Sequence, residues 1–267
     1  TPIWATNPKP TTGSTVMSVS VMESLSGLSE AEYFLGDTDP GVGNGATMLI
    51  STADNSIAAS TTFGTDFSTG VYKVSVRTKD LADNWSAVTT DYLVVYNPNG
   101  PRMTGKRTIT PSLVNGDFLV GLNNDSQTDT AKFGFSVKYD SQQQISTNSD
   151  FQFSYSTGTR CNSTNPNNPP QNCHQLELNS SSIAWLTTQG QNSAEGIFQG
   201  TGSLVVDGVG QQVIFRVTGL DGERLDSSSP DRFALSIFAV GEDPSSATPM
   251  HKINTTNVAQ GNVKIAD

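Results

Sequence analysis

The chain has 267 residues and a formal net charge of −10, and only 34% of its residues are hydrophobic and 15% charged. This length is enough for two domains of ordinary size, each with a hydrophobic core. The acidic balance argues against a nucleic-acid-binding protein, because phosphates would be repelled. The many Ser, Thr and Asn residues argue against a helical protein, because their side chains compete with helix hydrogen bonds.

A first unit is expected over residues 1–97. Residues 15–21 and 31–35 have the composition and alternation of strands, whereas residues 36–45 contain four glycines and a proline and predict a tight loop. Strand character returns at 48–51, and residues 71–96 hold two β-rich runs around a polar turn. Short strands with turn signals between them predict an antiparallel β-sandwich of about seven strands.

A second β-sandwich is expected over residues 111–267, after a linker at 98–110. Pro98 and Pro101 mark the linker, because two prolines and a glycine forbid a continuous strand. Apolar residues alternate with polar ones at 133–139, as strands require. Residues 232–240 are apolar at nearly every position, which predicts a central strand buried on both faces. No helical periodicity is sustained anywhere, so the whole chain is predicted to be all-β.

The two cysteines, Cys161 and Cys173, flank a segment with three prolines and five asparagines, which predicts a loop. A metal site would show closer cysteine pairs and more histidine partners than the adjacent His174 alone. We therefore predict a disulfide between Cys161 and Cys173, which would stabilise the fold by roughly 3 kcal/mol in the chain-entropy model. A disulfide in turn predicts an extracellular, oxidising location.

The order of motifs resembles two groups of surface domains. AEYF at 31–34, the loop at 36–45 and the strand pair at 71–96 resemble bacterial and archaeal surface immunoglobulin-like domains. The motifs FQGTG, VTGLDG and PDRF, which begin at Phe198, Val217 and Pro230, resemble the domain that follows choice-of-anchor domains in bacterial surface proteins. The cysteine loop departs from that pattern as an insertion. These resemblances imply that the first unit is immunoglobulin-like and that the chain is a spacer or adhesive module, and they carry over no catalytic residue.

Calcium is the one cofactor that the sequence suggests. Asp37 and Asp39 begin a glycine-containing loop like a calcium loop, but Met48 occupies the position where such a loop needs its bidentate glutamate. Asp80 and Asp83 in a neighbouring turn could complete a looser Ca²⁺ site. The alternative is that these side chains cap their own turns.

No catalytic residue is predicted. His174 and His251 lie in polar, loop-like sequence, and the Gly-x-Ser-x-Gly signature of serine hydrolases is absent. A carboxylate pair such as Asp221 and Glu223 could serve a glycosidase, but acidic residues in β-proteins are more often solvated turn residues. The chain is therefore expected not to be an enzyme.

The expected function is that of a structural or adhesive segment of a secreted, cell-surface or filament-forming protein. Its partners would be other copies of itself or other surface proteins, and it has no apolar run of the roughly 20 residues that a membrane span requires. The alternative is a carbohydrate-binding appendage of a larger secreted enzyme. For that role Trp4, Trp85 or Trp185 would have to form an exposed platform for a sugar, whereas we expect all three to be packed.

Overall fold

The computed structural model describes residues 2–21, 27–53, 56–122, 130–159, 164–168 and 171–266. The chain divides into two compact units, unit 1 at Thr1–Asn97 and unit 2 at Pro98–Asp267. Strands dominate both units, and the helical segments in the described ranges are three short 3-10 turns: η1 (Leu113–Asn115), η2 (Gln191–Ser193) and η3 (Gly222–Arg224). The predicted all-β fold class is confirmed.

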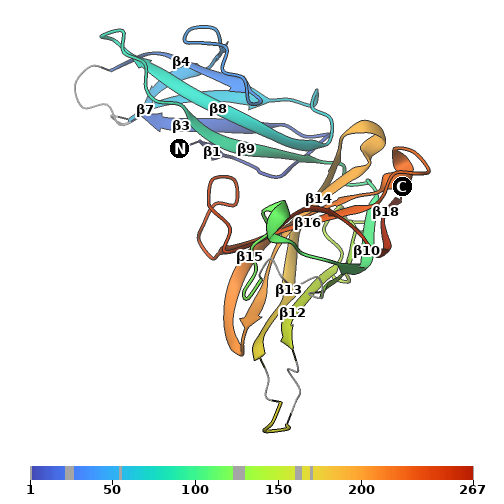
Figure 1. Ribbon diagram of the computed structural model, residues 1–267. Helices are drawn as coiled ribbons and strands as arrows, with labels where there is room; N and C mark the ends of the chain where they lie inside the picture. Colours follow the sequence, from blue (N-terminus) through green and yellow to red (C-terminus); the bar gives the residue numbers. More distant parts are fainter. Residues whose placement is uncertain are drawn as a thin grey trace. The chain divides into compact units, whose positions relative to one another are not determined.

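Unit 1 consists of two sheets (Figure 1). Its strands are β1 (Ile3–Trp4), β2 (Lys9–Pro10), β3 (Thr15–Val21), β4 (Leu28–Leu35), β5 (Ala46–Thr47), β6 (Leu49–Ala53), β7 (Ser56–Phe63), β8 (Gly70–Asp80) and β9 (Thr89–Tyr96). One sheet has the order β1-β3-β7-β6 and the other β2-β9-β8-β4-β5. Both sheets contribute side chains to one hydrophobic core.

The core of unit 1 follows from the alternation of its strands. In β3, Met17 and Val19 are buried, whereas Val16, the residue before Met17, is exposed. From the opposite sheet, Val74 and Val76 of β8 are fully buried in the same cluster. Burying side chains of this size contributes about 1.5–3 kcal/mol each, so the contact between the two sheets stabilises unit 1.

Unit 2 is one nine-stranded antiparallel sheet. Its strands are β10 (Arg102–Ile109), β11 (Thr130–Val137), β12 (Asp150–Thr159), β13 (Gln171–Gln189), β14 (Glu195–Val206), β15 (Val209–Leu220), β16 (Arg232–Ala239), β17 (His251–Asn257) and β18 (Gln260–Ala266). They are hydrogen-bonded in the order β17-β16-β15-β14-β13-β12-β11-β10-β18. The long strand β13 can be followed along the unit in Figure 1.

This sheet folds over itself. The rings of Phe133 in β11 and Phe233 in β16 are stacked with their centroids 4.2 Å apart. Four strands separate β11 from β16 in the sheet, so in a flat sheet these residues would lie roughly 24 Å apart. Register shifts between Ser180 and Ser182 and between Ile183 and Trp185 mark irregularities in β13, at the middle of the sheet. Unit 2 is thus one continuous, curled sheet that encloses a single core.

Two expectations about unit 2 are corrected. Residues 102–109 form β10, with Met103 and Ile109 fully buried, so the predicted linker at 98–110 is mostly strand. Charged residues and a glycine within the strand hide its alternation in the sequence. Residues 232–240 do not form a central strand buried on both faces: β16 is second from the edge, Phe233 is buried, and Val240 after the strand is 62% exposed.

In the described ranges, no helix has the length and apolar character needed to cross a membrane.

Candidate functional site

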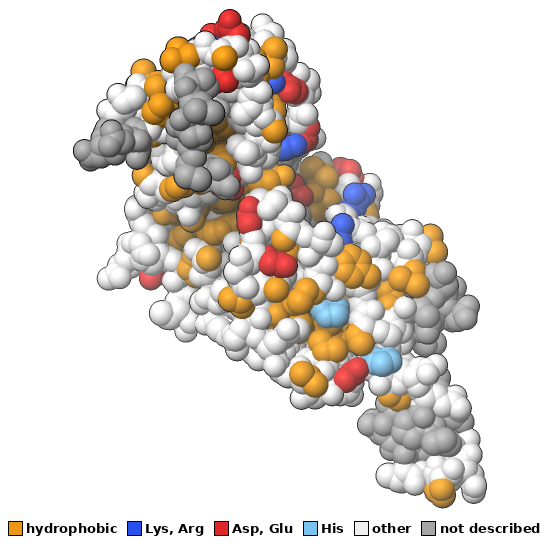
Figure 2. Space-filling view, turned by 90° about the vertical axis from the view of Figure 1, so that its left-hand side faces the viewer, with side chains coloured by type: hydrophobic (Ala, Val, Ile, Leu, Met, Phe, Trp, Pro, Cys, Tyr) orange, Lys and Arg blue, Asp and Glu red, His pale blue; other side chains and the backbone are white. Residues whose placement is uncertain are grey.

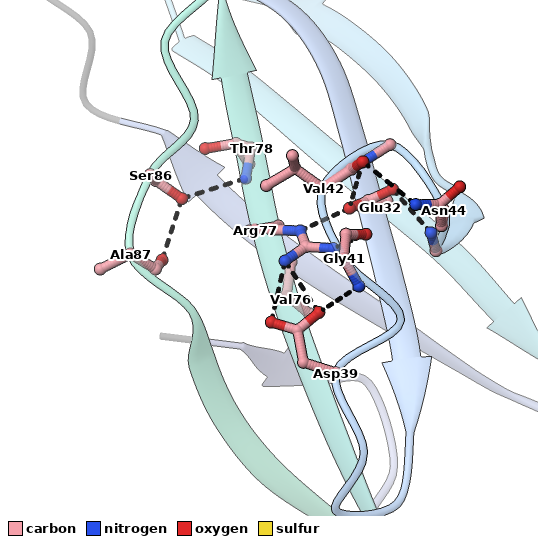
Figure 3. A network of polar contacts seen from close by, with 12 residues as sticks. Glu32, Asp39, Gly41, Val42, Asn44, Val76, Arg77, Thr78, Ser86 and Ala87 are labelled. Carbon is pink, nitrogen blue, oxygen red and sulfur yellow. Dashed lines mark hydrogen bonds and ion pairs between the residues drawn. The ribbon is translucent and has the colours of Figure 1, made fainter.

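A cluster of three charges lies on the five-stranded sheet of unit 1; Arg77 and Glu32 are buried and Asp39 is half-exposed. Arg77 in β8 donates from Nε to Glu32 Oε1 in β4, and from Nη1 to both carboxylate oxygens of Asp39 at 3.0 Å. Its Nη2 donates to the carbonyl oxygen of Gly41. Figure 3 shows the guanidinium between the two acidic side chains, with the loop of residues 36–45 arched over it. A single guanidinium therefore fastens this loop to the sheet.

Glu32 in β4 also binds the loop of residues 36–45. Its two carboxylate oxygens accept hydrogen bonds from the backbone N–H groups of Gly43 at 3.1 Å and Gly45 at 2.8 Å. A Cβ at Gly45 would lie 2.9 Å from the carbonyl oxygen of Tyr33, so only glycine lets the loop approach this closely. The loop that the sequence predicted is thus held by one residue from each of two neighbouring strands.

Burial makes this cluster costly to break. The side chains of Arg77 and Glu32 are only 3% and 5% exposed. Burial by itself would raise the pKa of Glu32, but the hydrogen bonds from Arg77, Gly45 and Gly43 outweigh it, and the pKa lies below its ordinary value of 4.5. Glu32 therefore stays ionised beside the guanidinium.

The guanidinium of Arg77 also contacts two aromatic rings. Its Cζ lies 5.4 Å from the ring centroid of Phe34 and 5.7 Å from that of Trp85. Such cation–π contacts contribute about 0.5–2 kcal/mol each. The sequence analysis did not identify Arg77 and Glu32 as an ion pair. The usable signal was one basic and one acidic residue on two strands that pair, where Glu32 lies directly opposite Arg77.

Each of the four predicted calcium ligands has another partner in the structure. Asp37 pairs with Lys73 at 2.9 Å, Asp39 is held by Arg77, and Asp83 pairs with Lys79 at 2.9 Å. Asp80 accepts hydrogen bonds from the backbone N–H groups of residues 82 and 84, as a carboxylate that caps its own turn does. Among the described residues no group of three or more His, Cys, Asp or Glu side chains could hold a metal ion. The calcium hypothesis gains no support from this arrangement.

Of the predicted disulfide pair, Cys173 lies near the start of β13. Cys161 lies outside the described residues, so the pairing stays a prediction. Thr159 of β12 is paired with Gln171 of β13, so Cys173 lies within a strand and the loop predicted at 161–173 ends earlier than expected.

Both histidines lie in strands rather than in loops, which corrects the sequence interpretation. His174 in β13 is hydrogen-bonded through Nδ1 to Asp207 Oδ2 at 2.8 Å. His251 in β17 is half-buried, and burial lowers its pKa below the ordinary value of 6.5. The sequence around each histidine is rich in polar residues, which hides the strand.

The tryptophans are packed, as predicted. Trp185 is 5% exposed, Trp4 donates from Nε1 to Asp91 Oδ2 at 2.8 Å, and Trp85 is half-buried beside Arg77.

Carboxylates close one edge of the nine-stranded sheet. Asp231 Oδ2 accepts from the backbone N–H of Val263 at 2.8 Å, and Asp221 Oδ2 accepts from that of Ile265 at 2.9 Å, both in β18. Arg224 donates from Nε to the carbonyl oxygen of Ile265 at 2.9 Å. Side chains from the segment after β15 thus take the place of a neighbouring strand. Asp221 is 3% exposed, so it is not the solvated turn residue that its sequence context suggested.

The opposite edge, β17, is closed in a similar way. Phe118 and Lys252 exchange two backbone hydrogen bonds of 2.9 Å. The buried carboxylate of Asp117 accepts from the backbone N–H of Asn254 at 2.8 Å and from that of Ser112 at 2.8 Å. Asp117, Asp221 and Asp231 were not recognised as edge-binding residues from the sequence, because their partners are far away along the chain.

A shallow hollow of about 320 Å³ lies on the outer face of unit 2. Lys106, Gly134, Gln152 and Asn179 lie in one row across four strands and line it. A Cβ on Gly134 would meet nothing within 4 Å, so the absence of a side chain there leaves the hollow open. Its polar groups can form hydrogen bonds, but the phenylalanines in its wall are buried and offer no ring face for stacking a sugar.

Replacing Arg77 with Met while keeping Glu32 should lower the free energy of unfolding of unit 1 by about 3–5 kcal/mol, because Glu32 is left buried without its cation. The double variant Glu32→Gln/Arg77→Met should lose less than the sum of the two single changes. Urea unfolding followed by tryptophan fluorescence measures both. The control is Lys73→Met, which breaks a pair whose Asp37 side chain is 91% exposed and should cost less than about 1 kcal/mol. Equal losses for Arg77→Met and Lys73→Met would contradict the role of the cluster.

The same pair predicts a pH dependence. The pKa of Glu32 is depressed in the folded state, so its contribution is present above the ordinary value of 4.5 and is lost as the pH falls below it. The stability of unit 1 should therefore fall below about pH 4.5 and should do so less steeply in Glu32→Gln.

Asp231→Ala should lower the free energy of unfolding of unit 2 by about 2–4 kcal/mol, because the N–H groups of Gly222 and Val263 lose their acceptor. Asp231→Asn, which keeps one carbonyl oxygen, should lose less. Asp243→Ala is the control, since Asp243 accepts hydrogen bonds within its own exposed turn. If Asp243→Ala proved as destabilising as Asp231→Ala, edge closure by Asp231 would be refuted.

No family model matches the chain, and neither the curated proteins nor the solved structures include a significant match.

Proposed function

We propose that this chain is a non-enzymatic structural or adhesive segment of a secreted, cell-surface or filament-forming protein. The observation that carries the proposal is the closure of both edges of the nine-stranded sheet by Asp117, Asp221 and Asp231. Both carboxylate oxygens of Asp117 and Asp231, and one of Asp221, accept hydrogen bonds from backbone N–H groups. A sheet closed in this way resists fraying and unintended pairing, as a load-carrying or spacing module requires.

The buried charges of unit 1 support the same role. Arg77 and Glu32 hold the loop at 36–45 against the sheet and do not face an open cavity. On the face shown in Figure 2, acidic and basic side chains are scattered and separated by uncharged surface. These features suit a stable surface that meets other macromolecules over broad areas rather than at one reactive point.

The carbohydrate-binding alternative has less support. It calls for exposed aromatic rings beside acidic groups in a groove. The hollow at Gly134 offers amide, hydroxyl and ammonium groups and the carboxylate of Glu177 but no exposed ring, and the three tryptophans are packed.

An extracellular location and the Cys161–Cys173 disulfide belong to this proposal. Alkylation of the unfolded, untreated protein should leave both cysteines unmodified, and alkylation after reduction should add two labels by mass spectrometry. Cys173→Ser is the matched control and should leave one thiol that reacts without a reductant. Two thiols that react freely in the untreated protein would overturn the disulfide and the argument for an oxidising compartment.

Electron microscopy of the protein in its native source tests the function itself. Gold-labelled antibodies against unit 2 should decorate a cell surface, a layer or a fibre. The same preparation should show no hydrolysis of glycans and no tight glycan binding. A dispersed protein that binds a glycan tightly would instead favour the carbohydrate-binding alternative and overturn the proposal.

A further inference from the structure

The three sheets of the described chain have six edge strands, and they are protected to different degrees. β1, β2 and β5 are two residues long, and β2 contains a proline. β17 and β18 are seven residues long, but residues 112–118 cover the first and Asp221 and Asp231 cap the second. β6 (Leu49–Ala53) is five residues long and ends the order of its sheet with no strand on its outer side in the described ranges.

β6 lacks the usual features that prevent pairing at an edge. Edge strands commonly carry lysines, prolines or inward-pointing charges that discourage a second chain. β6 has the sequence LISTA, which is uncharged, contains no proline and includes the β-branched residues Ile50 and Thr52. Leu49 is 77% exposed on the outer face, and Ile50 is 38% exposed at the rim of the core. Apolar surface thus flanks the open backbone edge on both sides.

The whole sheet that contains β6 is uncharged. Strands β1, β3, β6 and β7 contain no Asp, Glu, Lys or Arg, although the chain has a net charge of −10. Ile3 and Val16 add exposed apolar side chains to the same sheet, at 59% and 41% exposed. The other sheet of unit 1, by contrast, carries Arg77, Lys73 and several acidic residues.

This distribution of charge indicates that the partner of β6 is a second copy of the chain. Two copies of an acidic chain repel each other wherever their charged surfaces meet, so they can approach with little electrostatic cost only through an uncharged surface. A basic partner would instead be drawn to the acidic surfaces elsewhere. An antiparallel strand pair between identical strands has two-fold symmetry, so one pairing satisfies both copies and closes a dimer.

We propose that β6 is a self-association edge, and that two copies of the chain pair their β6 strands antiparallel into one eight-stranded sheet. The main-chain hydrogen bonds would give affinity. With Ile50 on the two-fold axis, Leu49 of each copy would lie opposite Ser51 of the other. This inference rests on the proposed structural function and specifies which surface joins the copies.

The test is sedimentation velocity of the full chain over a range of concentrations. The wild type should shift from monomer to dimer as concentration rises. Leu49→Lys/Ser51→Lys should weaken the dimer at least about tenfold, because like charges would face each other across the axis. The control Val114→Lys/Val209→Lys places two lysines at positions that are 87% and 72% exposed in unit 2 and should leave the dimer unchanged. Thermal unfolding verifies that each variant is folded.

A mixing experiment tests the pairing of β6 with β6. Leu49→Glu/Ser51→Glu alone should be monomeric, as should the lysine variant, but an equimolar mixture of the two at low salt should recover the dimer. A wild type that stays monomeric, a lysine variant that dimerises normally, or a mixture that fails to recover would each overturn the inference. A monomeric chain would leave the structural function itself standing, because electron microscopy of the native source tests that separately.

Discussion

Backbone N–H and C=O groups at the edges of sheets set the main physical problem for this molecule. A chain made almost wholly of strands has many such groups, and each edge must be paired, covered or left open to water or another chain. In unit 2 the problem is solved internally, since Asp117, Asp221 and Asp231 accept hydrogen bonds from the edge strands β17 and β18. The fold of the sheet over itself then places these edges at the margins of one shared core. Unit 1 solves the same problem with two-residue edge strands everywhere except at β6.

Buried charged side chains in both units form hydrogen bonds with the backbone of the same chain. Arg77 donates to the Gly41 carbonyl while Glu32 accepts from Gly43 and Gly45, so one ion pair fixes a whole glycine-rich loop. Lys9, fully buried, donates from Nζ to the carbonyl oxygen of Gly13 at 3.0 Å. A buried ion pair contributes little net stability compared with apolar residues of the same size, but removing one partner is costly. Such groups therefore specify one loop conformation more than they add to the total stability.

The sequence was informative where a strand has one face in the core and one in water. Thr15–Val21 forms β3 with the bounds that alternation predicted, and the loop at 36–45 lies where the glycines placed it. The alternation did not predict β10, because charged residues interrupt it. The apolar run that ends at Val240 predicted a buried strand too far, because the run continues beyond the core. The functional roles of carboxylates were harder to predict. Asp231 and Val263 are 32 residues apart, and only the folding of the sheet brings them together.

The distribution of charge connects the fold to the proposed function. If the charges of an acidic chain only kept it soluble, they would be expected over all of its sheets. They are instead missing from every strand of the sheet that ends in β6, while the neighbouring sheet holds Arg77, Lys79 and their acidic partners. Electrostatic repulsion between two copies would then disfavour most orientations of association but not the orientation in which their uncharged sheets meet. The same negative charge that prevents unspecific aggregation would thus select a single orientation for ordered association.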